Sequence, residues 1–288
     1  MKKLRGRILI ERWCLILPLA IVGMLAVGPV LFLLTGSLMG TQEIRHCLGV
    51  VVGSGEGYAI WHWIPLYPTL KNVVELCLDS PEFFQMFWNT AKITGGILAG
   101  QILFGVPVAW GLARYTFPGR RFVYVCYLIL MLMPFQVTML SEYLVLQKLG
   151  LLDTLAAVIL PGMFSAFPPF IMCRFFGGIP EALLEAARVD GAGEAAVFFY
   201  IGVPVGSSGI LSALILQFLE CWSMIEQPMT FLDTKSLWPL TLYLPQISME
   251  DAGFALCASF VALLPAVLVF LCGQDYLEQG IASTAIKE

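Results

Sequence analysis

The stretch AGFALCASFVALLPAVLVFLCGQ, Ala252–Gln274, contains no Asp, Glu, Lys or Arg. A helix of roughly 20 apolar residues is enough to cross a bilayer core about 30 Å thick, so this stretch is long enough to span a membrane. Five further uncharged stretches are also long enough: Trp13–Gln42, Ile93–Ala113, Phe122–Ser141, Thr154–Cys173 and Ala195–Leu219. The sequence therefore predicts an all-α, polytopic membrane protein with six transmembrane helices.

The composition of the whole chain supports the same class. Of 288 residues, 59% are hydrophobic and only 12% are charged, whereas a soluble domain is nearer half apolar and a quarter charged. This composition argues against a water-soluble enzyme, and it excludes intrinsic disorder, which requires low hydrophobicity. A net charge of −4 also gives no basic surface of the kind that binds nucleic acid.

The distribution of cations predicts the orientation in the membrane. Six crossings place both termini on one side, and Lys and Arg are enriched in cytoplasmic loops. With the N-terminus cytoplasmic, eleven of the sixteen cations lie inside, including the clusters in residues 2–12 and 114–121. We therefore expect a multi-pass protein of the cytoplasmic membrane with both termini cytoplasmic. The first span is too long for a signal-peptide core of about 7–15 residues, so we interpret it as an uncleaved helix.

The segment from about 43 to 83 is then an external loop, with a short helix expected near Leu70–Leu78. It contains Gly53, Gly55 and Gly57 but no periodic pattern. Cys47 and Cys77 both lie in this loop, where they either pair or remain free thiols. His46 and His62 do not have metal-ligand spacing, and we assign neither a ligand role.

The segment from Ile179 to Gly209 is too polar and too long to be a simple turn between spans. Pro180 and Glu181 suit a helix start, the Asp190-Gly191 pair suits a stop, and a second helical run extends from Glu194 to Tyr200. We predict two short helices at the membrane surface, joined at a glycine, with Pro204 marking the start of the next span. Four carboxylates can meet a cation or a helix N-terminus of a partner: Glu181, Glu185, Asp190 and Glu194. An amphipathic interfacial helix without a partner is the alternative.

This segment also carries a resemblance. Glu185-Ala186-Ala187 is followed after three residues by Gly191 and after nine more by Ile201-Gly202-Val203-Pro204. The pattern resembles the EAA signature of ABC importer permeases, with Val203 in place of Leu. Residues 188–192, Arg-Val-Asp-Gly-Ala, resemble the version in carbohydrate permeases of the maltose type. Further similarities cover roughly residues 84 to 288, including Asn89-Thr90, the turn at 113–121, Met133-Pro134, 149–154 and the tail from Gln274, and they resemble the smaller permease subunit.

The resemblance implies a type I ABC importer permease fold. Residues 1–83 would form the N-terminal tail, first helix and external loop, 84–274 the transmembrane domain with a cytoplasmic coupling loop at about 177–204, and 275–288 a cytoplasmic tail. Such proteins are not enzymes, and the chain has no Gly-x-x-x-x-Gly-Lys-Ser/Thr phosphate loop. No catalytic, cofactor or metal site is expected.

The resemblance also implies partners and a function. ABC ATPase subunits, a second non-identical permease and an extracytoplasmic solute-binding protein would join this chain to import a sugar or oligosaccharide. The residues expected to couple the ATPase are Glu185, Ala186, Ala187, Asp190, Gly191, Ile201 and Pro204. The alternatives are an ABC importer permease for another solute or a secondary transporter, which would need coupling-ion carboxylates near the midplane.

Polar residues inside the fifth span are candidates for the translocation pathway, since ionisable groups at membrane depth are usually functional. They are Gln217, Glu220 and Trp222. A protonated Glu220 bonded to a neighbouring helix, or one near the outer interface, is the alternative. Trp222-Ser223-Met224-Ile225 departs from the Trp-Asn-Glu-Phe that the family often has here. Four prolines interrupt spans three and four, where they either kink moving helices or are merely tolerated: Pro134, Pro161, Pro168 and Pro169.

Overall fold

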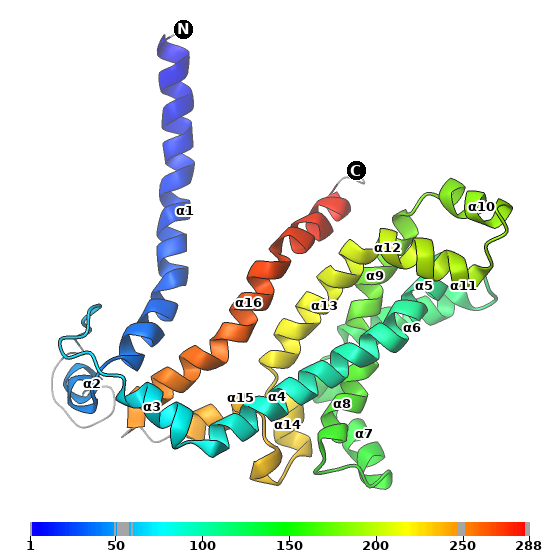
Figure 1. Ribbon diagram of the computed structural model, residues 1–288. Coiled ribbons are helices and arrows are strands. Elements are labelled where there is room, and N and C mark those ends of the chain that lie inside the picture. Colours follow the sequence, from blue (N-terminus) through cyan, green and yellow to red (C-terminus); the bar gives the residue numbers. More distant parts are fainter. Residues whose placement is uncertain (1, 49, 51–57, 59, 247–250, 286–288) are drawn as a thin grey trace. The chain divides into compact units, whose positions relative to one another are not determined.

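The computed structural model describes residues 2–48, 50, 58, 60–246 and 251–285, and every regular element in these ranges is a helix (Figure 1). The all-α prediction is thus confirmed. The chain divides into two compact units. The first comprises Met1–Phe83 and Gln246–Leu263, and the second comprises Phe84–Pro245 and Leu264–Glu288. Gly53, Gly55, Gly57 and Lys287 lie outside the described residues.

The first unit contains α1 (Lys2–Ser37), α2 (Thr41–Leu48), α3 (Lys71–Leu78) and the beginning of α16 (Ala252–Ala285). The last carbonyls of a helix lack partners within the helix, and here Asn72 supplies one. Its Nδ2 donates to the carbonyl oxygens of Ser37 and Met39, at 3.0 Å each, and the Asn72 side chain is buried. The helix α3 confirms the short helix expected near Leu70–Leu78.

Cys47 and Cys77 do not form a disulfide in this unit. Both are free thiols, with Cys47 buried and Cys77 exposed. Burial raises the pKa of the Cys47 thiol above its ordinary value, because removal from water disfavours the thiolate. The structure therefore favours the second of the two alternatives for this pair.

The second unit holds the remaining spans and their connections. Its first long helix runs through α4 (Pro81–Gly100), the π-helical turn η1 (Gln101–Gly105) and α5 (Val106–Arg114). The next helices are α6 (Arg120–Leu132), α7 (Phe135–Lys148), α8 (Leu155–Met163), α9 (Phe167–Gly178), α10 (Glu181–Val189), α11 (Glu194–Val197), η2 (Phe198–Gly202), α12 (Val203–Val205) and α13 (Ser207–Trp222). Short helices follow: α14 (Glu226–Phe231), η3 (Lys235–Leu237), α15 (Leu240–Tyr243) and η4 (Leu244–Gln246).

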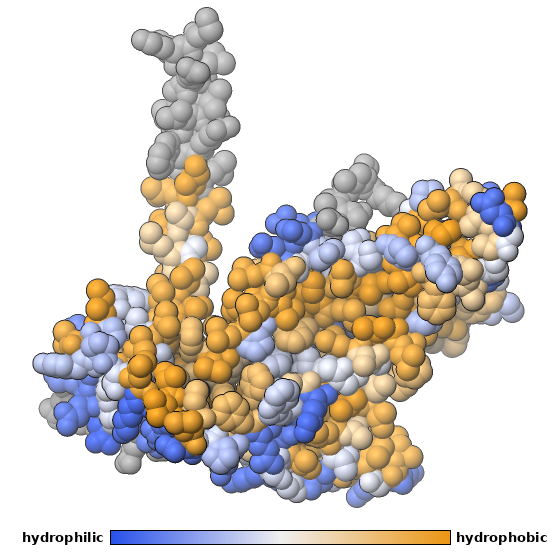
Figure 2. Space-filling view, in the orientation of Figure 1, coloured by the Kyte–Doolittle hydropathy of each residue, from blue (hydrophilic) through white to orange (hydrophobic). Residues whose placement is uncertain are grey.

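Four helical stretches in the described ranges are continuous and apolar enough to cross a membrane: Ile16–Ser37, Pro81–Arg114, Leu155–Gly178 and Ala252–Glu278. Two further stretches are helix pairs, Arg120–Leu132 with Phe135–Lys148, bent by 104°, and Glu194–Val205 with Ser207–Trp222, bent by 68°. Six spans result if each bent pair counts as one crossing. Figure 2 shows large apolar areas along these helices, as expected for surfaces that face lipid or other subunits.

The bend in the third span agrees with the first alternative for Pro134, a kinked helix, whereas the bend in the fifth span was not expected. The third breaks at Met133-Pro134, where both residues are extended, because the residue before a proline is pushed out of the helical region. The fifth bends at Gly206, which separates α12 from α13. An added Cβ at Gly206 would lie 2.5 Å from the Phe176 ring, so glycine is needed there for close packing against α9.

The core of the second unit lies where α9 packs between α5 and α13. Trp110, Met172 and Phe176 are buried at its centre, and the rings of Trp110 and Phe176 meet edge to face at 5.3 Å. An added Cβ at Gly209 would lie 2.1 Å from the Phe175 ring, so α13 approaches α9 closely. This packing holds the ends of three helices beneath the loop that contains α10.

Candidate functional site

The candidate coupling loop, residues 179–204, begins with a well-anchored helix. Pro180 precedes α10 in an extended conformation, and Glu181 and Arg188 occupy its first and last turns, where their charges suit the helix dipole. Leu184 has no exposed surface and belongs to the core cluster around Phe176. The prediction of a short helix after Pro180 is confirmed, and Leu184 fixes which face of it points inward.

Gly191 ends this helix in a Schellman motif. Its φ is +89°, a left-handed conformation that glycine adopts without steric penalty. The Gly191 amide donates to the Arg188 carbonyl at 3.0 Å, and the Ala192 amide donates to the Ala187 carbonyl at 2.9 Å. These are the two bonds that define the motif. The spacing between Ala187 and Gly191 therefore has a physical basis, because it closes the helix and reverses the chain.

A chain of charged side chains then ties the loop together. Arg114 at the end of α5 lies 3.3 Å from Glu181, and Arg188 lies 3.1 Å from Glu181 and 2.8 Å from Glu194. The Tyr115 hydroxyl donates to Glu194 at 3.1 Å. Hydrogen bonds to Glu194 and Glu181 hold the pKa of Arg188 above its ordinary value. We call these five residues the clasp.

The clasp corrects the expectation that all four loop carboxylates are available to a partner. Glu181 and Glu194 are engaged within the chain. Within the described residues, Glu185 and Asp190 are exposed and make no side-chain hydrogen bond or ion pair. Beside them Val189 is 86% exposed. The surface left for a partner is thus a smaller one, with two carboxylates and an apolar residue.

Sequence reasoning did not select Arg114, Tyr115 or Arg188 as site residues. The signal was present, because the cations of the turn at 114–121 and the carboxylates of the 179–194 loop were both assigned to the cytoplasmic side. Arg114 also donates to the Ile179 carbonyl, so it holds the first residues of the loop as well as Glu181.

The other predicted coupling residues divide between the loop surface and the core. Ala186 is exposed, whereas Ala187 is half-buried and packs against the core. Ile201 packs against the same core, and Pro204 is exposed just before the bend at Gly206. Pro204 therefore lies within Glu194–Val205, the first helix of the bent pair that forms the fifth span, and does not mark the start of that span.

The three candidate pathway residues of α13 do not share one surface. Gln217 is 2% exposed, and its Nε2 donates to the Cys221 sulfur at 3.1 Å. Glu220 is exposed, and the Trp222 ring stacks on Phe218 at 5.3 Å. Gln217 thus faces the interior of the unit while Glu220 faces outward. Within the described part of the chain, no group of three His, Cys, Asp or Glu side chains could hold a metal ion.

Comparison with known proteins identifies the class of this architecture. Residues 101–283 match the family described as "Binding-protein-dependent transport system inner membrane component". The chain belongs to this family. It is a multi-pass membrane permease subunit of a transport system, and not an enzyme.

Relatives and solved structures extend the likeness over almost the whole chain. The sequence is 28% identical over 279 residues to the arabinooligosaccharides transport system permease protein AraQ of Halalkalibacterium halodurans, with 96% of each chain covered. It is 26% identical over 255 residues to the sn-glycerol-3-phosphate transport system permease protein UgpE of Brucella abortus, covering 86% of this chain and 87% of that one. A chain of a bacterial ABC transporter involved in the import of the acidic polysaccharide alginate superposes with a TM-score of 0.77 at 20% identity, over 93% of this chain and 96% of that one. The expected ABC importer permease fold is confirmed.

Proposed function

We propose that this permease carries a sugar or oligosaccharide through the membrane in an ATP-driven ABC importer, and that residues 179–204 dock on its ATPase. The similarity to AraQ over nearly the whole chain supports a saccharide substrate. The sequence contains no phosphate-binding loop, so the energy would come from a separate ATPase subunit. An extracytoplasmic binding protein would deliver the substrate, and a second, non-identical permease would complete the pathway.

The observation that carries the docking proposal is the combination of a rigid loop with an unpaired surface. The Schellman motif and the clasp fix the backbone of α10, while Glu185, Val189 and Asp190 remain exposed. A loop held in this way can transmit a displacement to the spans that precede and follow it. Ala186 leaves room on the same surface for another chain to approach closely.

The orientation with both termini cytoplasmic agrees with how the second unit is built. The cation-rich turn at 114–121 meets the 179–194 loop at one end of the unit. Asp153 accepts a hydrogen bond of 2.8 Å from the Thr234 amide at the other end, beside α14. Figure 1 shows α10 and α11 at the opposite end of this unit from α7 and α14. The predicted inner and outer segments thus gather at separate ends.

A second substrate class also has a specific observation in its favour. The relative UgpE is named as a permease for sn-glycerol-3-phosphate, so an importer for a phosphorylated polyol is the alternative. Uptake of labelled arabinooligosaccharide and glycerol-3-phosphate by cells expressing the full importer distinguishes the two.

Charge reversal at the loop tests the docking proposal. Glu185→Arg should lower ATP-driven uptake and substrate-stimulated ATP hydrolysis by about tenfold or more. In the docking proposal the Glu185 carboxylate faces positive charge on the ATPase, and an arginine at this position would repel that charge. Glu82→Arg, at an exposed position at the start of α4, is the matched control and should not affect coupling. Membrane content of each variant is measured by immunoblotting. Normal uptake by Glu185→Arg would contradict the docking assignment. In a separate measurement, uptake by the purified protein without any co-purifying ATPase would indicate a secondary transporter instead.

A further inference from the structure

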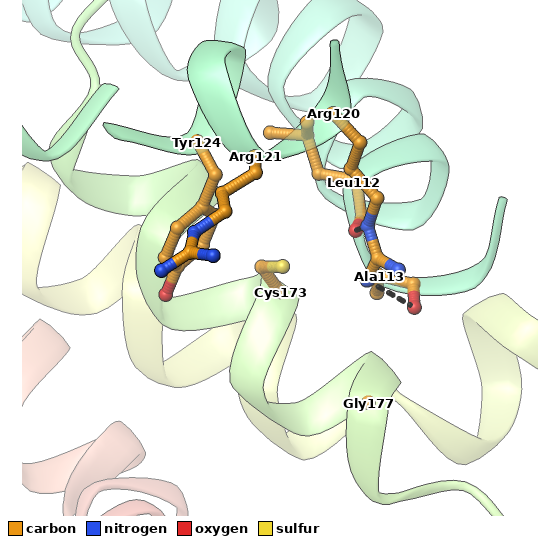
Figure 3. Close-up of a pocket in the computed structure, with 7 residues that line it drawn as sticks. All are labelled: Leu112, Ala113, Arg120, Arg121, Tyr124, Cys173 and Gly177. Atoms are coloured by element: carbon orange, nitrogen blue, oxygen red, sulfur yellow. Dashed lines mark hydrogen bonds between the residues drawn. The ribbon is translucent and has the colours of Figure 1, made fainter. Parts of the chain in front are cut away.

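A second charged site lies close to the candidate coupling loop and plays no part in the clasp. It is a pocket of about 360 Å³ between the end of α5, the start of α6 and the last turns of α9, lined by Arg120, Arg121, Tyr124 and Cys173 among others (Figure 3). No lining residue is acidic. In Figure 3, Arg120 lies on one side of the Cys173 thiol, and Arg121 and Tyr124 lie on the other.

Arg120 is fixed by the backbone beneath it. Its Nε donates to the Leu112 carbonyl at 2.9 Å, and its Nη2 donates to the Ala113 carbonyl at 3.3 Å. A guanidinium has five N–H donors and cannot be deprotonated in a protein, so three donors and the full charge remain. Two carbonyls thus orient this cation toward the pocket without neutralising it.

Arg174, which follows the lining residue Cys173 in α9, adds a third cation near the pocket but does not line it. Its guanidinium lies 5.7 Å from the centre of the Phe170 ring, and that ring lies 6.2 Å from the Tyr124 ring that lines the pocket. Arg120, Arg121 and Arg174 form no ion pair with any described residue, although Arg114 and Arg188 nearby do. The pocket is therefore a concentration of uncompensated positive charge.

The position of the pocket on the span decides which anion suits it. Arg120 and Arg121 begin α6, a helix of an apolar span. The following turns expose Phe122, Leu130 and Leu132 at 72%, 57% and 75%. A ligand that fits both features has an anionic head and apolar chains. Basic pockets between transmembrane helices near the cytoplasmic surface are suited to anionic lipid headgroups.

From this geometry we infer that the pocket binds the phosphate headgroup of an anionic phospholipid, whose acyl chains lie along the exposed apolar side of α6. The phosphate oxygens accept hydrogen bonds from Arg120 and Arg121, and Arg174 contributes positive charge nearby. Lipid bound here would hold the turn between α5 and α6 beside the candidate coupling loop. This inference concerns a site that the transport proposal does not use.

The test measures lipid retention by the intact importer. The purified complex is incubated with phosphatidylglycerol or phosphatidylcholine carrying the same acyl chains, and bound lipid is counted by native mass spectrometry. Arg121→Gln combined with Arg174→Gln removes two cations and leaves the Arg120 backbone contacts in place. Lys148→Gln, an exposed cation at the opposite end of the unit, is the matched control.

We expect retention of phosphatidylglycerol over phosphatidylcholine, and about 30-fold weaker phosphatidylglycerol binding in the double variant, since each cation near a membrane surface is worth about 1 kcal/mol. Lys148→Gln should bind as the unmodified protein does. Equal retention by the double variant and the control overturns the inference, as would happen if the second permease covers this face. Complete displacement by millimolar inorganic phosphate also overturns it, because the site would then bind a soluble anion.

Discussion

Replacing Gly191 by alanine should loosen the candidate coupling loop by a defined amount. The residue has a φ of +89°, and an added Cβ would meet no atom within 4 Å. The penalty is therefore confined to the backbone, where a left-handed conformation costs an L-residue roughly 1–2 kcal/mol. That energy corresponds to a shift of about 5- to 30-fold in the equilibrium between the loop with the two Schellman hydrogen bonds formed and the loop with them broken. The amide of Ala192, bonded to the Ala187 carbonyl, should become exposed to solvent correspondingly more often.

Hydrogen–deuterium exchange of the purified importer measures this directly in peptides covering residues 181–194. Gly193→Ala is the matched control, since Gly193 has an ordinary φ of −71° and equally open surroundings. It should leave exchange unchanged. Gly191→Asn should fall between the two, because asparagine tolerates the left-handed region better than alanine. Equal exchange in Gly191→Ala and Gly193→Ala would show that the helix does not end in a Schellman motif, and the reasoning would fail.

Two other predictions concern the packing of the spans and the connections at the opposite end of the second unit. Gly209→Ala should destabilise the protein by about 1–3 kcal/mol, because the added Cβ would lie 2.1 Å from the Phe175 ring. Gly95→Ala is the control and should be neutral, because its Cβ would meet no atom within 4 Å. Thermal unfolding in detergent compares the two variants, and equal melting temperatures would contradict the close approach of α13 to α9. The pKa of Asp153 is held below its ordinary value by hydrogen bonds from the Thr234 hydroxyl and amide, so its stabilisation is present at neutral pH and lost as the pH falls below about 4. Asp153→Asn should melt below the unmodified protein at pH 7, and the difference should shrink as the pH falls below about 4. A difference that does not shrink with falling pH would rule out this carboxylate as its source.

The spans could be predicted from the sequence because charge is so scarce in them. The continuous helix Ala252–Glu278 follows from one uncharged stretch, since only length and hydropathy matter for a crossing. The bend at Pro134 was signalled by the proline itself. The bend at Gly206 was not, because it depends on a long-range contact with Phe176 that no local pattern reveals.

The candidate site shows a similar division. The turn at Asp190-Gly191 follows from local chemistry, since glycine after a helix is the usual stop signal. The ion pair between Glu181 and Arg114 connects residues far apart in the sequence. The distribution of charges assigned both residues to the same side of the membrane, but it could not show that they contact each other. Gln217 and Glu220 illustrate the opposite problem, because residues three apart on a helix are neighbours and yet one is buried and the other exposed.

The clasp has a mechanical consequence. Glu181 is joined to the end of α5 by Arg114, while Arg188 joins it to Glu194 at the start of α11. A force applied to α10 from outside is therefore shared between the second span and Glu194–Val205, the first helix of the fifth span. Gly206 separates this part of the fifth span from α13, with a bend of 68° between them. Contacts within this one chain would therefore pass a load on α10 to two helices at once, through residues that need not touch either nucleotide or substrate.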